Sequence, residues 1–321
     1  MSQPQRVSMA MVAARAGVSG QTVSRVANDS PKVDPETRAR VEQAMAELGY
    51  RPNRAARALR TGRTHTLGLV AQTLATVGNS RMLQAVAESA AARGYALTVV
   101  TLGIDGDIAR AFDRLHDQGV DGAVVLNEAT ALARDAASAG LRLVVVDSPP
   151  DDRFTVIGTD HAAGARLATE HLLAEHERVH HLAGPAGSYA ADERERGWRA
   201  AVPDAPAPLR GDWSAASGYA QGRALAADPD VTAVFVANDQ MALGLLRALA
   251  EMGRRVPEDV AVIGFDDIAD AADYSPPLST IRQDFDALGE QAVQALVAAI
   301  EGTEASAPDL AMPELVLRAS A

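Results

Sequence analysis

The sequence contains no cysteine and a single lysine, Lys32, among its 321 residues. Without cysteine the chain can form neither a disulfide framework nor a thiolate zinc site. It also lacks the run of roughly 18 apolar residues that a membrane-spanning helix needs, and the residues that follow Met1 do not form the apolar core of a signal peptide. We therefore expect a cytoplasmic protein with no membrane partner.

Sequence motifs of enzymes are missing as well. The chain has no phosphate-binding loop, no serine nucleophile elbow and no zinc-protease motif. Its seven histidines include the neighbours His180 and His181, but adjacent residues of a strand face opposite sides and are poorly placed to share a metal. A scattered catalytic set stays open as an alternative. We expect no enzyme activity, no catalytic residue, no cofactor and no metal.

Charge is distributed unevenly along the chain. Residues 1–63 carry ten arginines and Lys32 against five acidic residues, a net charge of +6, whereas the whole chain carries −12. The remainder is therefore at −18. A basic arm on an acidic body predicts that only the arm contacts phosphate groups, because the body repels nucleic acid.

Local signals in the basic arm predict three short helices. Ser8 is placed to cap the first helix, the second runs from about 20 to 28, and Asp34 is placed to cap the third, which stops at Gly49. A helix, a tight turn with glycine and a second helix follow the helix-turn-helix plan. A plain three-helix packing module is the alternative, and the basic stretch 51–63 favours DNA binding.

In a helix-turn-helix the second helix lies in the major groove, and its first residues meet base edges. Glutamine pairs with adenine and arginine with guanine, while small hydroxyl and amide side chains hold phosphate oxygens. The DNA contacts predicted for this helix are Ser19, Gly20, Gln21, Thr22, Ser24, Arg25 and Asn28.

From residue 66 onward, short apolar runs alternate with helical patterns. The strand-like runs are 67–71, 97–101, 122–126, 141–147, 179–183, 232–237 and 260–264, and the helical patterns include 80–92, 108–118, 161–175, 239–252 and 285–301. This alternation is typical of parallel sheets with helices on both faces. The strands fall into two sets, so we predict two α/β lobes with a ligand at the carboxyl ends of the strands.

The order of these motifs resembles the LacI family of transcriptional regulators over nearly the whole chain. The matching segments are 7–28 (VSMAMVAARAGVSGQTVSRVAN), 37–53, 184–185 with 192–198, 236–244 (VANDQMALG), 262–267 (VIGFDD) and 276–285 (PPLSTIRQDF). The resemblance implies an α-helical helix-turn-helix headpiece and an α/β, two-lobe, periplasmic-binding-protein-like (type I) sensor. The sequence differs from the family pattern at Met11, where many members carry an acidic residue, and at Gly20, where the family often places a base-reading side chain.

The resemblance further implies a hinge helix after the headpiece. Asn53, Ala56 and Leu59 would contact DNA there, with Leu59 wedged into the minor groove. A seven-residue helix is marginal alone, so we expect it to form only when two copies pair on DNA. The predicted domains are the headpiece 1–52, the hinge helix and linker 53–63, and an effector-binding and dimerisation domain 64–321, divided into an N-lobe (64–159 with 283–321) and a C-lobe (160–282).

One headpiece covers one half-site, so a palindromic operator requires a homodimer. Some members of the family add a C-terminal heptad helix that tetramerises, whereas residues 312–321 have the pattern of a last strand and a short tail, so we expect a dimer and not a tetramer. Planar bidentate side chains suit the vicinal hydroxyls of a sugar, and an indole suits its apolar face. The predicted effector-binding residues are Gln72, Asn127, Asp147, Arg194, Trp213, Asn238, Asp266, Gln283 and Phe285.

The function that follows is a sequence-specific repressor whose operator affinity is lowered by a small sugar bound between the lobes. Two other readings stay open. A solute-binding protein of the same fold would need an export signal and would lack residues 1–63. A regulator with a purine corepressor would bind DNA more tightly with its ligand.

Overall fold

The computed structural model describes residues 7–27, 30–50, 62–103, 106–127, 129–136, 140–303 and 310–321. By its internal contacts the chain divides into two units, Met1–Thr64 and His65–Ala321. The DNA contacts predicted for Asn28, Asn53, Ala56 and Leu59 lie outside the described residues, as does the hinge helix that was predicted to contain the last three.

The N-terminal unit is a headpiece of three helices. They are α1 (Met9–Ala16), α2 (Gly20–Ala27) and α3 (Pro35–Leu48). Each helix contributes a fully buried valine to one core, namely Val12, Val23 and Val41. Since the described buried members of this core are valine and alanine only, the apolar area that holds the headpiece together is small.

Capping supports the short helices of the headpiece, as the sequence predicted. The Ser8 hydroxyl accepts a hydrogen bond from the Met11 amide at 3.3 Å, and the Asp34 carboxylate accepts one from the Thr37 amide at 2.9 Å. Gly49 follows α3 with φ of 64°, a left-handed conformation that costs glycine little. Such caps satisfy amide and carbonyl groups that the helix itself leaves without partners.

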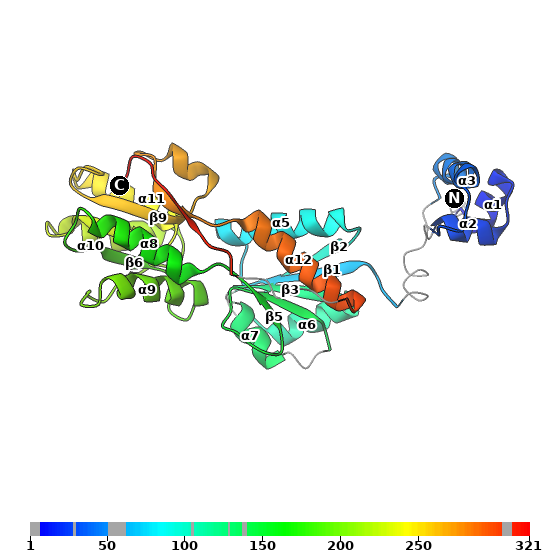
Figure 1. Cartoon of the computed structure of the whole chain (residues 1–321), viewed down its shortest axis with the longest axis horizontal. Helices are drawn as coiled ribbons and strands as arrows, with labels where there is room; N and C mark the ends of the chain where they lie inside the picture. The colour runs from blue at the N-terminus through cyan, green and yellow to red at the C-terminus, as the bar shows by residue number, and fades with distance from the viewer. Residues whose placement is uncertain are drawn as a thin grey trace, which may run out of the picture. The chain divides into compact units, whose positions relative to one another are not determined.

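The second unit begins with a lobe built on a parallel sheet in the order β2-β1-β3-β4-β5. Its elements are β1 (Thr66–Ala71), α5 (Val77–Ala92), β2 (Ala96–Thr101), α6 (Ile108–Asp117), β3 (Gly122–Leu126), α7 (Ala129–Ala136), β4 (Leu143–Val146), β5 (Thr155–Ile157) and α12 (Phe285–Glu301). Helices α5 and α12 cover one face of this sheet, and α6 and α7 cover the other (Figure 1).

The other lobe has a sheet in the order β11-β10-β9-β8-β6-β7. Its elements are α8 (His161–Leu173), β6 (His180–Ala183), α9 (Tyr189–Ala201), β7 (Leu209–Arg210), α10 (Ala215–Ala227), β8 (Ala233–Val236), α11 (Asp239–Glu251), β9 (Ala261–Asp266), the 3-10 helix η2 (Ala269–Asp273), β10 (Ser279–Arg282) and β11 (Glu314–Val316). Helices α10 and α11 pack on one face, and α8 and α9 on the other. A helical headpiece followed in the chain by two α/β lobes confirms the predicted fold class.

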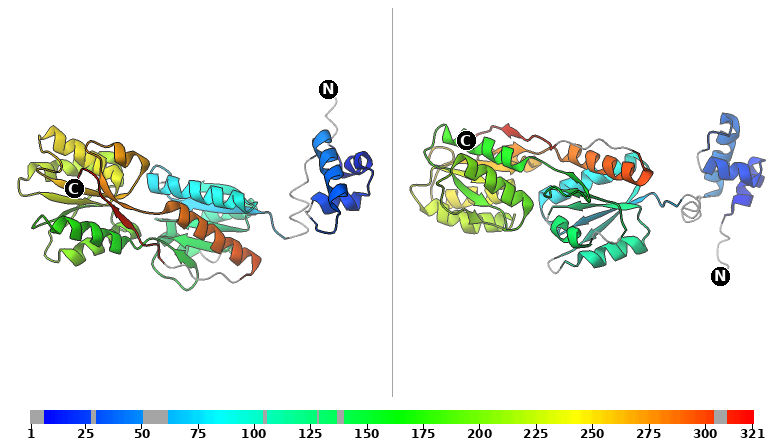
Figure 2. Two further views of the ribbon diagram at one scale, coloured as in Figure 1. Left: turned by 45° about the horizontal axis from the view of Figure 1, so that its top comes forward. Right: turned by 60° about the horizontal axis from the view of Figure 1, so that its bottom comes forward.

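One detail of the predicted lobe division is wrong. Residues 283–321 were assigned as a whole to the first lobe, but β11 pairs antiparallel with β10, with Ile281 opposite Leu315. The apolar pattern identified a last strand, but strand pattern alone does not specify which sheet edge it joins. The chain therefore passes between the lobes after β5, after β10 and again after α12, and the last passage carries the C-terminal strand along the second lobe (Figure 2).

Both sheets reverse their strand order near the centre. The chain moves from β1 outward to β2 and then back to β3 on the other side of β1, and it moves likewise from β6 to β7 and β8. A crevice forms outside the carboxyl ends of the strands at such a reversal. Among the described residues, no helix is long and apolar enough to cross a membrane.

Candidate functional site

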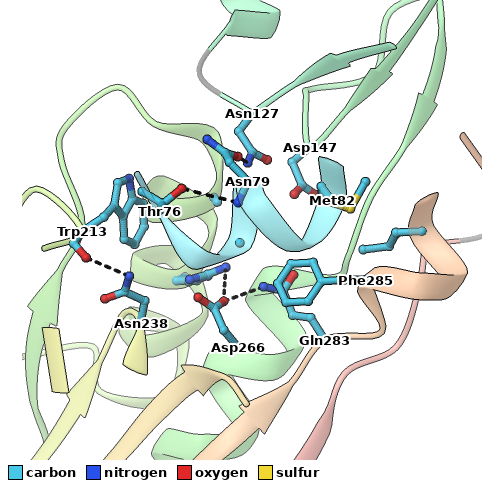
Figure 3. A pocket seen from close by; sticks show the side chains of 14 residues that line it. Thr76, Asn79, Met82, Asn127, Asp147, Trp213, Asn238, Asp266, Gln283 and Phe285 are labelled. Carbon is cyan, nitrogen blue, oxygen red and sulfur yellow. Dashed lines mark hydrogen bonds and ion pairs between the residues drawn. The ribbon is translucent and has the colours of Figure 1, made fainter. Parts of the chain in front are cut away.

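A cleft of about 510 Å³, its mouth included, lies between the two lobes. Side chains of both lobes converge on it (Figure 3). The lining residues are Thr76, Gly78, Asn79, Met82, Asn127, Asp147, Ala190, Arg194, Trp213, Asn238, Asp266, Gln283, Phe285 and Leu288.

The structure brings together eight of the nine side chains that the sequence indicated as effector-binding. Gln72 is the exception. It follows β1 as expected, but its side-chain amide donates to the carbonyl oxygen of Gly103 at 2.9 Å and the residue does not line the cleft. The loop after β2 provides this carbonyl, and the sequence around β1 does not predict a hydrogen bond to that loop.

Four of the lining residues, three at strand ends and Trp213 in the loop after β7, have an unusual backbone conformation. The φ angles are 46° at Asn127, 55° at Asp147, 74° at Trp213 and 114° at Asp266. Positive φ is uncommon outside glycine, and Asn and Asp are the residues that tolerate it best. Such conformations persist only where the surrounding structure holds them, and they gather at functional sites.

Arg194 lies at the centre of the C-lobe wall of the cleft. It projects from α9 and is 4% exposed. Its guanidinium donates to the carbonyl oxygen of Ala237, forms an ion pair with Asp266 at 3.4 Å, and lies over the Phe265 ring at 3.8 Å from the ring centroid. Stacking on an aromatic face and pairing with a carboxylate hold a planar guanidinium in one orientation.

His161 extends this network across the lobes, and the sequence analysis missed it. Its Nδ1 accepts a hydrogen bond from Arg194 Nε at 3.4 Å, and its Nε2 lies 3.0 Å from Asp147 Oδ1. The residue opens α8 immediately after the first passage between the lobes. The only local signal was the preceding residue, Asp160, which caps α8. A capping residue predicts the start of a helix and does not indicate a binding site.

The pKa values of the two carboxyl groups in the cleft are shifted in opposite directions. Burial alone would raise the pKa of Asp147, but the His161 imidazole, the Thr159 amide and Arg194 outweigh it, and the pKa is lowered. Burial raises the pKa of Asp266, and Arg194 and the Gln283 amide offset this only in part. Neighbouring positive charge and donated hydrogen bonds favour the ionised form of a carboxyl group, whereas desolvation opposes it.

Asn238 holds the end of β8 against the Trp213 loop. Its Oδ1 accepts from the Met241 amide at 2.9 Å and its Nδ2 donates to the Trp213 carbonyl at 3.1 Å. Asn238 is therefore the cap of α11. Asp239 is fully buried and accepts from the Ile268 amide at 2.9 Å.

The headpiece presents a polar face on α2. Gln21 and Arg25 are one helical turn apart and exposed, while Val23 and Val26 on the opposite face are buried. The Ser19 hydroxyl accepts from the Thr22 amide at 3.1 Å and so caps the helix. Gly20 is exposed, and a Cβ added there would meet no atom within 4 Å.

Comparison with known proteins agrees with this architecture. Residues 8–53 match the family of bacterial regulatory proteins of the lacI family, and residues 169–321 match the periplasmic binding protein-like domain. The chain is 38% identical to the lactose operon repressor of Escherichia coli K12 over 318 residues, which cover 96% of this chain and 88% of that protein. The chain belongs to the LacI family.

Other LacI-family proteins match at similar lengths. HTH-type transcriptional regulator CelR of Thermobifida fusca is 37% identical over 94% of each chain, and HTH-type transcriptional repressor PurR of Pasteurella multocida is 36% identical over 96% of this chain and 97% of that protein. A crystal structure of the lac repressor dimer bound to operator and the anti-inducer ONPF superposes with a TM-score of 0.86 at 36% identity, covering 98% of this chain and 99% of that one. These relatives are named as transcriptional regulators.

Two side chains of α5 and the residue that caps it complete the N-lobe wall, and the sequence analysis did not identify them. Thr76, Asn79 and Met82 recur at three-residue spacing and line the cleft. Asn79 is 1% exposed. A buried asparagine within an otherwise apolar helix face was the signal that could have identified this helix, because polar side chains are rarely buried without a partner.

Proposed function

We propose that this LacI-family protein is a sequence-specific transcriptional repressor that binds a palindromic operator as a homodimer, and that a small sugar bound between the lobes lowers its operator affinity. The observation that carries the proposal is the network around Arg194. A fixed guanidinium, carboxylate oxygens of Asp147 and Asp266, and the indole of Trp213 surround one cleft. Bidentate polar groups beside an aromatic face suit a pyranose ring, which has hydroxyls at its edge and C–H groups on its faces.

Related structures support the ligand and DNA classes. The lac repressor dimer has been solved with operator and ONPF, and CelR has been solved as a complex with cellobiose, with a TM-score of 0.73 at 35% identity. By analogy we assign the α2 residues Ser19, Gln21, Thr22, Ser24 and Arg25 to the operator contact of this chain, together with the backbone of Gly20.

The linker between the units would transmit the ligand signal. We propose the headpiece at 1–52 and a hinge helix and linker at 53–63, in which Asn53, Ala56 and Leu59 contact the minor groove once two copies pair. A seven-residue helix is marginal without such pairing. A change in the lobes that moves the two hinges apart would therefore unfold them and weaken operator binding.

Two contacts that join the lobes support this proposal. Asp147 of the N-lobe pairs with His161 of the C-lobe at 3.0 Å, and the Val77 amide of the N-lobe donates to Gln240 of the C-lobe at 3.0 Å. A ligand that binds Arg194 and Asp147 together favours one separation of the lobes over another. The shift it can produce is limited to the difference between its affinities for the two states.

The test is a fluorescence anisotropy titration of a labelled duplex from the region upstream of the gene, at fixed salt, with and without a panel of sugars. We expect tight binding to a palindrome and release by one sugar. Tight binding that no sugar weakens would contradict the effector assignment, and a purine that strengthens binding would establish the corepressor alternative. Failure to bind any upstream duplex at moderate salt would contradict the operator assignment.

A further inference from the structure

The N-lobe wall of the cleft contains two side-chain amides that are hydrogen-bonded to each other, Asn79 and Asn127. Asn79 projects from the first turn of α5, and Asn127 follows β3 (Figure 3). Asn79 Nδ2 donates to the carbonyl oxygen of Thr73 at 3.0 Å, and Asn79 Oδ1 accepts from Asn127 Nδ2. The three groups form one chain of hydrogen bonds that ends at the cleft.

The direction of this chain is determined by its first member. A backbone carbonyl only accepts, so the amide of Asn79 must turn its nitrogen to Thr73 and its oxygen to Asn127. Asn127 must then turn its nitrogen to Asn79. The carbonyl oxygen of Asn127 is left for the cleft, and no described residue donates to it.

Other open oxygens face the same space. Gln283 is 7% exposed; its Nε2 donates to Asp266 Oδ1 at 2.6 Å, and its Oε1 is buried with no hydrogen-bond partner among the described residues. Among the described residues, Thr159 and His161 contact Asp147 at Oδ1, and Arg194 and Gln283 contact Asp266 at Oδ1. The cleft therefore presents several acceptors. Of these Gln283 Oε1 is buried without a donor among the described residues, which is unfavourable until a ligand donates to it.

We propose that Asn79 is a positioning residue that fixes the Asn127 carbonyl toward the cleft, and that the resulting acceptor wall selects a neutral polyhydroxylated ligand and rejects phosphorylated or carboxylated sugars. The inference rests on the proposed sugar-binding function and sharpens it. A sugar hydroxyl donates to each open oxygen. An anion would lie beside two carboxylates, and the guanidinium that could balance it already serves Asp266 and Ala237.

The ligand test is isothermal titration calorimetry of the full chain with lactose, cellobiose, galactose and galactose 6-phosphate. We expect a neutral sugar to bind and galactose 6-phosphate to show no heat at concentrations where galactose saturates. If galactose 6-phosphate bound as tightly as galactose, the proposed rejection of anionic sugars would be contradicted. If none of these four compounds bound, the proposed sugar function itself would be contradicted for them.

A double-mutant cycle tests the positioning role with whichever sugar binds. Loss of one oriented neutral hydrogen bond predicts that Asn79→Ala weakens binding about threefold to tenfold. In an Asn127→Ala background the same change should cost less than about twofold, because the group it orients is gone. Additive losses would show that Asn79 acts independently of Asn127 and would overturn the inference. Gln84→Ala, on the exposed face of the same helix, is the control and should leave affinity unchanged.

A measurement on the ligand-free wild-type protein distinguishes failure of the Asn79 inference from failure of the proposed sugar function. Side-chain amide exchange followed by NMR should show protected Nδ2 protons on both Asn79 and Asn127, since each donates within the protein. In the Asn79→Ala variant the Asn127 protons should lose that protection. Unprotected exchange of the Asn79 side-chain amide in the wild type would refute the proposed chain of hydrogen bonds, whatever the sugar results are.

Discussion

The headpiece and the two-lobe unit are stabilised in different ways. The buried residues of the headpiece core are valines and alanines among the described residues, and its short helices depend on caps such as Ser8 and Asp34. The two-lobe unit buries large side chains such as Trp198 and Phe112 in four clusters on both faces of two sheets. Local signals therefore dominate the first, and contacts between distant segments dominate the second.

The difference matters for where polar groups can be buried. A cleft that holds Arg194, Asp147 and Asp266 out of water carries a desolvation cost, which only a large layered core can offset. The headpiece keeps its polar residues Gln21 and Arg25 exposed, where they stay hydrated and carry no such cost. Changes in the cleft should accordingly leave operator binding intact, and changes in the headpiece core should leave effector binding intact.

The largest expected effect is that of Arg194→Ala. Removing one partner of a buried ion pair leaves Asp266 without its cation and should cost about 3–5 kcal/mol of unfolding free energy. Sugar binding should be lost, while the protein that folds still binds operator and is no longer released from it. Calorimetric unfolding and anisotropy measure the two effects. Arg196→Ala is the control, because that side chain is exposed and its pair with Glu193 lies at the surface, where such pairs contribute at most about 1 kcal/mol.

The site residues that sequence could predict share one property. Asn127, Asp147, Asn238 and Asp266 follow or end strands, so the rule that ligands bind at the carboxyl ends of parallel strands indicates them without knowledge of packing. Gln72 obeys the same rule and still turns away, to Gly103. The rule identifies candidates, and the neighbouring loop decides which of them enter the cleft.

Residues that project from helices were outside the reach of that rule. Asn79 and His161 lie in the cleft network because of how α5 and α8 pack against strands distant in sequence. Arg194 and Trp213 also project from a helix and a loop, and only the family resemblance indicated them. Helix caps and helix ends of the headpiece were predicted closely because each depends on residues three or four apart.

The next prediction concerns acid stability, and it separates the two units because residues 1–64 contain no histidine. Burial lowers the pKa of His181 to about 4, while Nδ1 bonds to the Phe235 carbonyl at 2.9 Å. An unfolded histidine has a pKa of about 6.5 and binds its proton first as pH falls. The folded state is therefore fully favoured above about pH 6.5, and about 3 kcal/mol is lost between pH 6.5 and pH 4.

His181→Phe should remove this loss of stability at acid pH (the acid limb of the pH profile). A ring of similar size keeps the stacking against Phe235, which lies at 4.8 Å between ring centroids in the wild type. Urea unfolding of the two-lobe transition at a series of pH values gives the free energy. His116→Gln, at an exposed position of α6, should leave the limb unchanged. An acid limb of the same depth in the His181→Phe protein would assign the loss to other groups.

In the headpiece a smaller change should act on its own unit alone. Val23→Ala removes two methyl groups from a side chain that is fully buried and should cost about 2 kcal/mol. Because the core is small, that loss should lower the headpiece melting temperature and weaken operator binding, while the two-lobe transition and sugar affinity stay as in the wild type. Val99→Ala, at an exposed position of β2, is the matched control. A shift of both transitions would show that the units unfold together.

The smallest expected effect concerns the operator base pair opposite Gly20. The residue has no side chain to read a base edge, whereas Gln21 and Arg25 have one each, and a bidentate contact discriminates by about 1–3 kcal/mol. In a series of single base-pair substitutions we expect changes of less than about threefold opposite residue 20 and at least about fivefold opposite Gln21 and Arg25. The space around Gly20 is open, so Gly20→Gln should fold normally and introduce discrimination at that base pair. Strong discrimination there by the wild-type protein would mean that the backbone or the DNA shape specifies it.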